Sequence, residues 1–202
     1  MHLSGRRLLL ARRFGQGSRG MDDHAVQETE LSPGQDAWED DRIGSGMRRW
    51  QREFPDIDCS GKAVVGRILH LHELMLKSVN RALAKRKLKY PSYAVLATLR
   101  VEGLPYRMTP KELLESLILT SGGLSNILRR LETAGHVRRL ADERDGRGVV
   151  VELTEHGRKT VEPAMRAHAQ TERRLIAALS PEERIMAARA LGLMMLANRD
   201  GP

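Results

Sequence analysis

Two arginines and two aspartates alternate in a short segment between apolar stretches of the chain. The sequence ADERDGRGVVVEL, residues 141–153, places Asp142, Arg144, Asp145 and Arg147 within six positions, directly before a run of valines. A guanidinium group binds phosphate through paired N–H donors, and the negative potential of the DNA minor groove attracts inserted arginine. The aspartates would repel phosphate, so we expect each of them to pair with an arginine and hold the segment in shape.

A second polar set lies just upstream, in SGGLSNILRRLETAG. Leucine and isoleucine recur there at three- and four-residue steps, which is typical of one face of a helix. The outward positions are polar: Ser121, Ser125, Asn126, Arg129 and Arg130. Gly122 and Gly123 fall in the first turn, where free N–H groups suit a phosphate. Because the major groove of duplex DNA admits one α-helix, this face could read base edges.

The elements predicted around these two sets follow the order helix, helix, hairpin, which is that of a winged helix-turn-helix. Apolar periodicity predicts a long first helix over 62–86, stopped by Tyr90-Pro91, and a short second helix over 92–100. Thr109-Pro110 opens a third helix, and Thr120 or Ser121 caps a fourth that Gly135 ends. The expected strands are 136–140 and 148–153. Thr154 caps a fifth helix that reaches about Leu179, and a capping box over 180–183 opens a sixth that reaches about Asn198.

Composition favours an aliphatic, mainly helical protein with an anionic partner. The chain of 202 residues is 41% hydrophobic and 3% aromatic, and its net charge is +8. Residues 61–202 carry 25 basic and 15 acidic side chains, a net charge of +10, so the expected folded part is more basic than the whole chain. A strongly basic domain points to nucleic acid, although the charge alone is a weak indicator.

The cysteine content and the apolar runs indicate the cellular compartment, and the patterns along the chain indicate its domains. Cys59 is the one cysteine, which excludes an internal disulfide, and we expect it to be an inert thiol rather than a redox switch. No apolar run is long enough to span a bilayer or to form a signal-peptide core, so we expect a cytoplasmic protein without a membrane partner. The expected domains are a disordered extension over 1–46, N-terminal helices over 47–104, a DNA-binding core over 105–154 and C-terminal dimerisation helices over 155–202.

The segment from MTPKELLES to LTEHGR resembles the DNA-binding core of the MarR family of bacterial transcriptional regulators. The family's wing pattern Asp-x-Arg-Asp-x-Arg is matched over 142–147, and its hairpin exit Leu-Thr-x-x-Gly-Arg is matched over 153–158. WQREFPDID, which begins at Trp50, is similar to a subgroup of the family. The resemblance covers about residues 50–198.

The resemblance implies a mainly α fold with a small β-hairpin wing and an obligate homodimer that binds a pseudo-palindromic operator in double-stranded DNA. It implies repression that a small aromatic or anionic ligand relieves. It also implies that Arg144 inserts into the minor groove while Asp145 and Arg147 brace it. Urate-responsive members place an acid before the Val-Leu of the second helix, where this chain has Ala94, and this difference argues against a urate-type ligand.

Four side chains are candidates for the ligand site. Trp50 is either a ligand-stacking residue or part of the dimer core, and Arg67, His70 and Tyr93 could line a pocket between the first and second helices. A solvated helix face is the simpler interpretation of Arg67 and His70.

No enzyme, cofactor or metal site is expected. Gly15-x-Gly17-x-x-Gly20 lacks the strand and helix that give this dinucleotide-binding motif its meaning, and no catalytic motif is present. His70 and His72 are two residues apart, so their side chains diverge on a helix and do not chelate a metal. The alternative to an operator-specific repressor is an architectural nucleic-acid-binding protein that uses charge without reading sequence.

Overall fold

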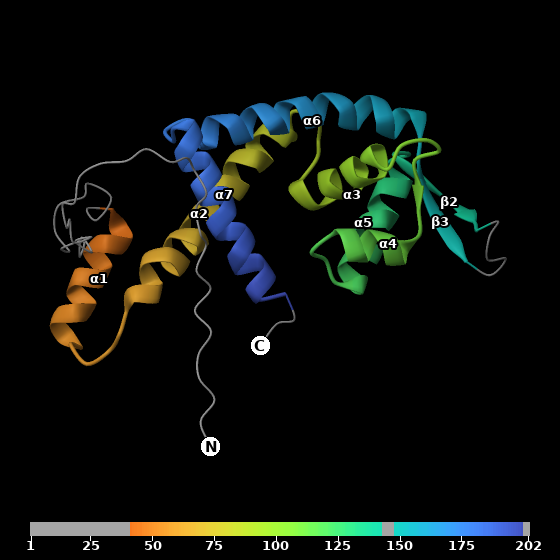
Figure 1. The fold of residues 1–202 in the computed structure, drawn as a ribbon. Coiled ribbons are helices and arrows are strands. Elements are labelled where there is room, and N and C mark those ends of the chain that lie inside the picture. The colour runs from red at the N-terminus through yellow and green to blue at the C-terminus, as the bar shows by residue number, and fades with distance from the viewer. Residues whose placement is uncertain (1–40, 143–147, 200–202) are drawn as a thin grey trace, which may run out of the picture.

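The computed structural model describes residues 41–142 and 148–199. Along these residues the elements follow the order α1, α2, α3, β1, α4, α5, β2, β3, α6, α7. Two long helices, α2 (Ser60–Ala84) and α6 (Glu155–Leu175), pack against each other. They connect a group of small elements at one end of the molecule to α1 (Arg42–Glu53) and α7 (Pro181–Ala197) at the other (Figure 1).

The small elements form a winged helix-turn-helix. They are α3 (Tyr90–Val101), β1 (Arg107–Met108), α4 (Pro110–Ser116), α5 (Ser121–Thr133), β2 (Val137–Ala141) and β3 (Val149–Leu153). β3 is the central strand and pairs antiparallel with β1 on one side and β2 on the other. In the main hairpin Val137 pairs with Leu153 and Ala141 with Val149, so the wing begins directly after α5.

The core is aliphatic and lies between α3, α5, the sheet and the two long helices. Its most deeply buried side chains come from six different elements: Leu83, Val95, Leu96, Leu99, Leu113, Leu124, Val151 and Val161. Each such side chain contributes about 1.5–3 kcal/mol when it leaves water. The leucine of α5 in this set therefore fixes that helix to a rigid base.

The sequence-based prediction of a mainly α protein with a small hairpin wing is confirmed, and most helix starts follow their caps. The Thr109 hydroxyl accepts a hydrogen bond from Glu112 N–H, and the Glu112 carboxylate accepts one from Thr109 N–H in return. The same reciprocal capping box is formed at Ser180. Of the two caps considered for the fourth helix, Thr120 is the one that the structure uses.

Three element predictions were wrong in position, and one strand was not predicted. Helix α1 begins at Arg42, because the Asp41 carboxylate accepts hydrogen bonds from Ile43 and Gly44 N–H, so residues 42–46 are helical rather than part of a disordered extension. Helix α2 ends at Ala84, and Tyr90-Pro91 forms the first turn of α3, where proline is tolerated. Strand β1 was missed because it has two residues. Helix α6 ends at Leu175 rather than at about Leu179.

Within the described ranges, the helices are all too short or too polar to cross a membrane.

Candidate nucleic-acid interface

Helix α5 presents one apolar and one polar face, as its sequence predicts. Leu124, Leu128 and Leu131 are at most 3% exposed and pack into the core. The opposite face is exposed and carries the five predicted polar positions, Ser121, Ser125, Asn126, Arg129 and Arg130. The structure thus brings these five side chains together on one surface of one helix.

The first turn of α5 is stabilised by Thr120 and is open at Gly122. The Thr120 hydroxyl accepts a hydrogen bond of 3.1 Å from Gly123 N–H. A Cβ atom at Gly123 would lie 3.0 Å from that hydroxyl oxygen, whereas one at Gly122 would meet nothing within 4 Å. Gly123 therefore accommodates the cap, and Gly122 leaves the backbone accessible to a partner.

Arg129 is held on the surface of α5 by its own helix. Its Nη2 donates a hydrogen bond of 2.9 Å to Asn126 Oδ1, one turn earlier. Both side chains remain exposed. An arginine that is oriented before binding loses less side-chain entropy when it binds, so this pair is suited to contact a base edge or a phosphate.

The wing is closed below its tip by the backbone. Asp142 N–H donates a hydrogen bond of 2.9 Å to the carbonyl of Gly148, which continues the β2–β3 pairing by one step. The side chain of Asp142 is half-buried. Arg144, Asp145 and Arg147 lie outside the described residues, so their assigned roles stay predictions.

An ion-pair network crosses the sheet at the base of the wing, and no local sequence pattern predicts it. The Glu152 carboxylate of β3 accepts hydrogen bonds from Arg107 of β1 and from Arg138 Nε of β2, the latter at 2.7 Å. Both arginines are register partners of Glu152. Burial alone would raise the pKa of Glu152, but the hydrogen bonds and charges of the two arginines outweigh it and hold this pKa below its usual value.

The hairpin-exit motif joins the end of α5 to the start of α6. The Thr154 hydroxyl accepts from Gly157 N–H at 3.0 Å and lies 2.7 Å from the carbonyl oxygen of Gly135, to which it donates. A Cβ atom at Gly157 would lie 2.1 Å from the His136 carbonyl oxygen. The motif therefore forms a close backbone contact, and this contact fixes α6 relative to α5 and the wing.

A histidine pair covers the same contact. The rings of His136 and His156 stack with centroids 4.7 Å apart, and His136 Nδ1 is buried without a hydrogen-bond partner among the described residues. Burial lowers the pKa of His136, and the neighbouring His156 lowers it further. A neutral His136 therefore lies at the contact between α6 and the end of α5.

The four candidate ligand residues come from three helices: Trp50 from α1, Arg67 and His70 from α2, and Tyr93 from α3. Arg67 pairs with Asp41 at 2.8 Å and so connects α2 to the start of α1. Trp50 is 41% exposed and lies against Phe54 and the Lys62 ammonium group.

Tyr93 lies on α3, and His70 lies on α2 one turn after Arg67. Tyr93 is buried in α3 beside His168 of α6, and burial, with the charge of Glu172, raises its pKa to about 12. His70 is half-buried on α2. The ion pair of Arg67 with Asp41 places it at the α1–α2 contact, whereas Tyr93 contacts α6.

The fold and this surface define a class of protein: a winged helix-turn-helix whose helix α5 and wing can contact duplex DNA. Comparison with known proteins places it within that class. A sequence model of the MarR family matches residues 87–148. The chain is 31% identical over 146 residues to the transcriptional regulator PecS of Dickeya dadantii, covering 72% of this chain and 88% of that protein. The chain belongs to the MarR family of transcriptional regulators.

Further relatives agree with this assignment. The regulator TtmR of Methylorubrum extorquens is 47% identical over 77 residues, which cover 38% of this chain and 37% of that protein. Among solved structures, a mutant MarR from E. coli complexed with operator DNA has a TM-score of 0.60 at 25% identity and covers 72% of this chain and 97% of its own. AbsC from Streptomyces coelicolor has a TM-score of 0.66 at 27% identity, with coverage of 71% and 97%.

Proposed function

We propose that this regulator is a homodimeric repressor that binds a pseudo-palindromic operator in double-stranded DNA and is released by a small aromatic or anionic ligand. The observation that carries the proposal is the polar face of α5, on which Asn126 holds Arg129 in an exposed position. A protein that binds DNA by charge alone needs no oriented side chain on this face, whereas a protein that reads bases does.

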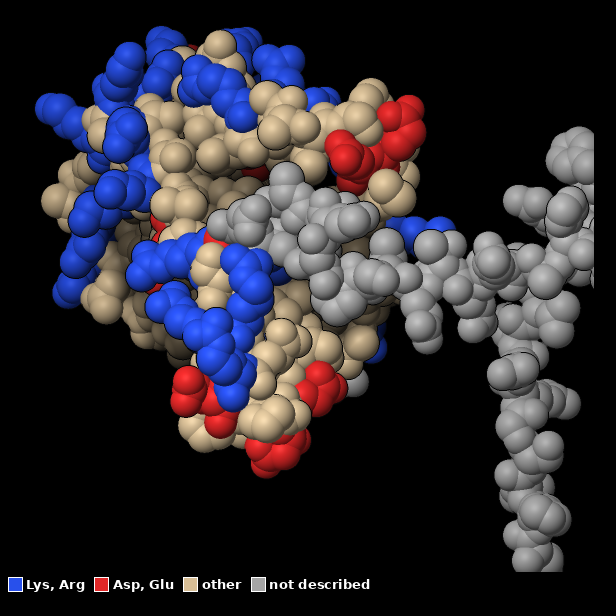
Figure 2. Space-filling view, turned by 90° about the vertical axis from the view of Figure 1, so that its left-hand side faces the viewer, with Lys and Arg blue, Asp and Glu red and all other residues tan. Residues whose placement is uncertain are grey.

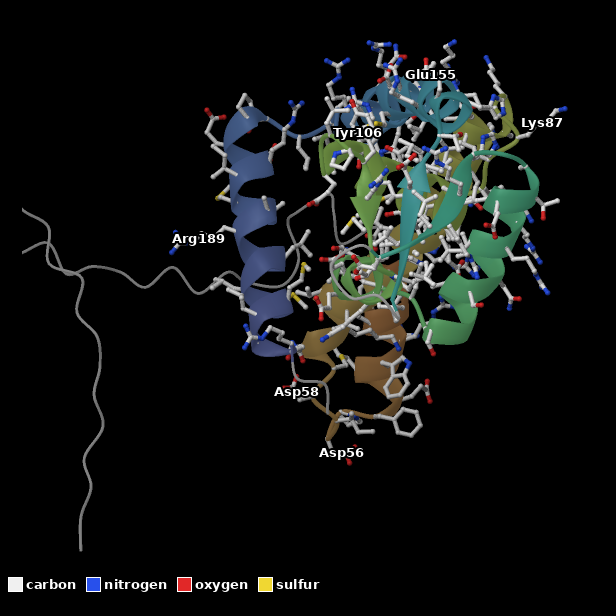
Figure 3. The ribbon with its side chains drawn as sticks, turned by 90° about the vertical axis from the view of Figure 1, so that its right-hand side faces the viewer. Asp56, Asp58, Lys87, Tyr106, Glu155 and Arg189 are labelled. Atoms are coloured by element: carbon white, nitrogen blue, oxygen red, sulfur yellow. The ribbon has the colours of Figure 1, made fainter. Side chains whose placement is uncertain are left out.

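Helix α7 supports the homodimer. It contains no buried residue among those described, and six of its large apolar side chains are 45–71% exposed: Ile185, Met186, Leu191, Leu193, Met195 and Leu196. Figure 3 shows α7 standing apart from the rest of the molecule, with Arg189 pointing outward. Apolar surface of this extent is typical of a protein interface. A second copy of the chain would cover it, with 47–104 and 155–202 supplying the dimerisation helices around the DNA-binding core of 105–154.

The dimer has a direct test in sedimentation. The full chain at micromolar concentration should sediment as a dimer, and Leu193→Asp should shift it toward monomer or lower its stability, because a charge would replace an apolar contact. A wild-type chain that sediments as a folded monomer would contradict this part of the proposal.

Recognition of a specific DNA sequence has its own test. The natural control region beside the gene and a scrambled duplex of equal length are titrated with the protein at matched salt. We expect operator affinity to exceed scrambled affinity by at least about 10³-fold and both affinities to fall steeply with salt. Equal affinities would instead support the architectural alternative.

The ligand part of the proposal is tested without DNA. A thermal-shift series with small aromatic acids should raise the melting temperature, since a ligand stabilises the state that it binds. Trp50, Arg67, His70 and Tyr93 stay candidates for this site. Trp50→Ala should remove the shift if Trp50 stacks on the ligand, and should lower the melting temperature without ligand if it belongs to the dimer core.

A further inference from the structure

A cavity of about 580 Å³ lies between α2 and α6, away from the polar face of α5. Helix α3 contacts both α6 and α5, so it separates the two regions (Figure 1). The cavity is lined by Ser78, Arg81 and Ala82 of α2, by Lys85 and Arg86 directly after the end of α2, and by Ala167, Gln170, Thr171, Arg174 and Leu175 of α6.

Among the described residues, the lining carries four cationic side chains and no acidic one. Arg81, Lys85 and Arg86 form no ion pair with any residue in the described part of the chain. Arg81 and Lys85 are four residues apart on one helix face, where like charges repel each other. This arrangement costs free energy that a bound anion would offset. Figure 2, which shows the side of the molecule that lies at the left in Figure 1, has many Lys and Arg side chains on its surface and few Asp and Glu.

A buried hydroxyl group orients the guanidinium group of Arg174. Thr171 is 4% exposed, and its Oγ1 donates a hydrogen bond of 2.8 Å to the carbonyl of Ala167. The same oxygen accepts one of 3.1 Å from Arg174 Nη2. One N–H of the guanidinium group is thereby used within the protein, and the group is fixed beside the cavity with its other donors left for a ligand.

The chemistry of the lining decides the class of ligand. Within the part of the chain that the structure describes, no aromatic side chain lines the cavity, so these residues offer no face on which an aromatic ring could stack. Guanidinium groups bind phosphate through two parallel hydrogen bonds, and hydroxyl and amide groups of Ser78 and Gln170 can add further ones. We propose that this cavity binds a compact, non-aromatic anion with more than one negative charge, of the phosphate or diphosphate class.

The proposal goes beyond the repressor function, since none of the four candidate ligand residues lines this cavity. It is tested with inorganic pyrophosphate added to the full chain without DNA, at constant ionic strength, by calorimetric titration and thermal shift. Wild-type protein should bind pyrophosphate and melt at a higher temperature in its presence. Citrate should bind at least fivefold more weakly, and benzoate should not compete.

The decisive variant is the double substitution Arg81→Gln with Arg174→Gln, which removes one guanidinium group from each helix. It should weaken pyrophosphate binding at least tenfold. Lys111→Gln on α4 removes the same kind of charge from an exposed position outside the cavity and should bind as wild type. If the double variant does not fold, Arg81→Lys keeps the charge but not the paired donors, and should still weaken binding.

Three results would overturn the proposal. One is equal loss of binding in Lys111→Gln, which would mean that pyrophosphate responds to net charge alone. Another is wild-type affinity in the double variant or in Arg81→Lys. The third is a lower salt dependence of DNA binding in the double variant, which would assign these arginines to the DNA backbone.

Discussion

Arg138 and Glu152 face each other across the wing hairpin as register partners, and Arg138 Nε donates a hydrogen bond of 2.7 Å to Glu152 Oε1. The Glu152 side chain is 10% exposed, while that of Arg138 is 60% exposed. Arg107 approaches the same carboxylate from the other neighbouring strand. One buried carboxylate therefore connects all three strands at the base of the wing.

Glu152→Gln should destabilise the protein. The amide keeps the shape of the side chain but loses the charge that two arginines share. Hydrogen bonds to charged groups contribute about 1.5–3 kcal/mol, and the exposure of Arg138 reduces this, so we expect a loss of about 1–2 kcal/mol in the free energy of unfolding at pH 7. Urea unfolding measures it. Glu155→Gln, which removes an exposed partner of Arg158, is the control and should cost less.

The difference between wild type and Glu152→Gln should depend on pH. The folded-state pKa of Glu152 lies below its ordinary value of 4.5. Its contribution to stability is therefore fully present above the unfolded-state pKa and is lost as the pH falls toward the folded-state pKa. The gap between the two urea midpoints should be constant from pH 7 to about pH 5.5 and shrink below about pH 4.5. A gap that widens on acidification would mean that the arginines do not stabilise the ionised carboxylate.

Gly157→Ala should be destabilising, although alanine in a helix usually stabilises by about 1 kcal/mol relative to glycine. The new Cβ would lie 2.1 Å from the His136 carbonyl oxygen and 2.7 Å from Leu153 Cδ1, so the backbone contact between α6 and the end of α5 must open. Thermal unfolding should show a lower melting temperature. Gly61→Ala on α2 meets nothing within 4 Å and should leave the melting temperature equal or higher.

Sequence reasoning was accurate where local signals act alone. The periodicity of 121–131 placed every inward leucine of α5, and the hydroxyls of Thr109, Thr120, Thr154 and Ser180 marked helix starts. It failed at α1 because Gly44, Ser45 and Gly46 disfavour a helix when read locally. That helix is held by its Asp41 cap and by the Arg67 ion pair with the same carboxylate, and a contact between residues so far apart leaves no local pattern.

The candidate DNA-binding site also has a part that the sequence predicts and a part that it does not. The polar face of α5 follows from periodicity, because exposure on a helix is set by residue spacing. The Glu152 network does not, since it needs the register of three strands and one of them, β1, has two residues. The pocket of Arg67, His70 and Tyr93 stays a prediction. The contact of Tyr93 with His168 of α6 has no local sequence pattern, because it joins residues far apart in the chain.

Arg129→Ala should relax the choice of base more than it weakens binding overall. A side chain that contacts a base edge contributes about 1–3 kcal/mol of discrimination against the wrong base. Competition between the operator and single-base variants of it should show one or two positions at which discrimination falls. Lys159→Ala on α6 removes a charge of the same sign from an exposed position outside α5 and should leave the preference for each base unchanged. Uniform weakening at every position by Arg129→Ala would assign Arg129 to a phosphate.

The wing tip gives the sharpest test, because two physical accounts predict opposite signs. The Asp142 N–H to Gly148 hydrogen bond closes the hairpin just below residues 143–147. If Arg144 inserts into the minor groove and Asp145 braces an arginine, both Arg144→Ala and Asp145→Ala should weaken operator binding, with the melting temperature unchanged. Simple electrostatics instead predicts that removing the Asp145 charge near a polyanion tightens binding. Operator affinity of Asp145→Ala and of wild type, measured at the same salt concentration, separates the two, and tighter binding by Asp145→Ala would show that this aspartate braces nothing.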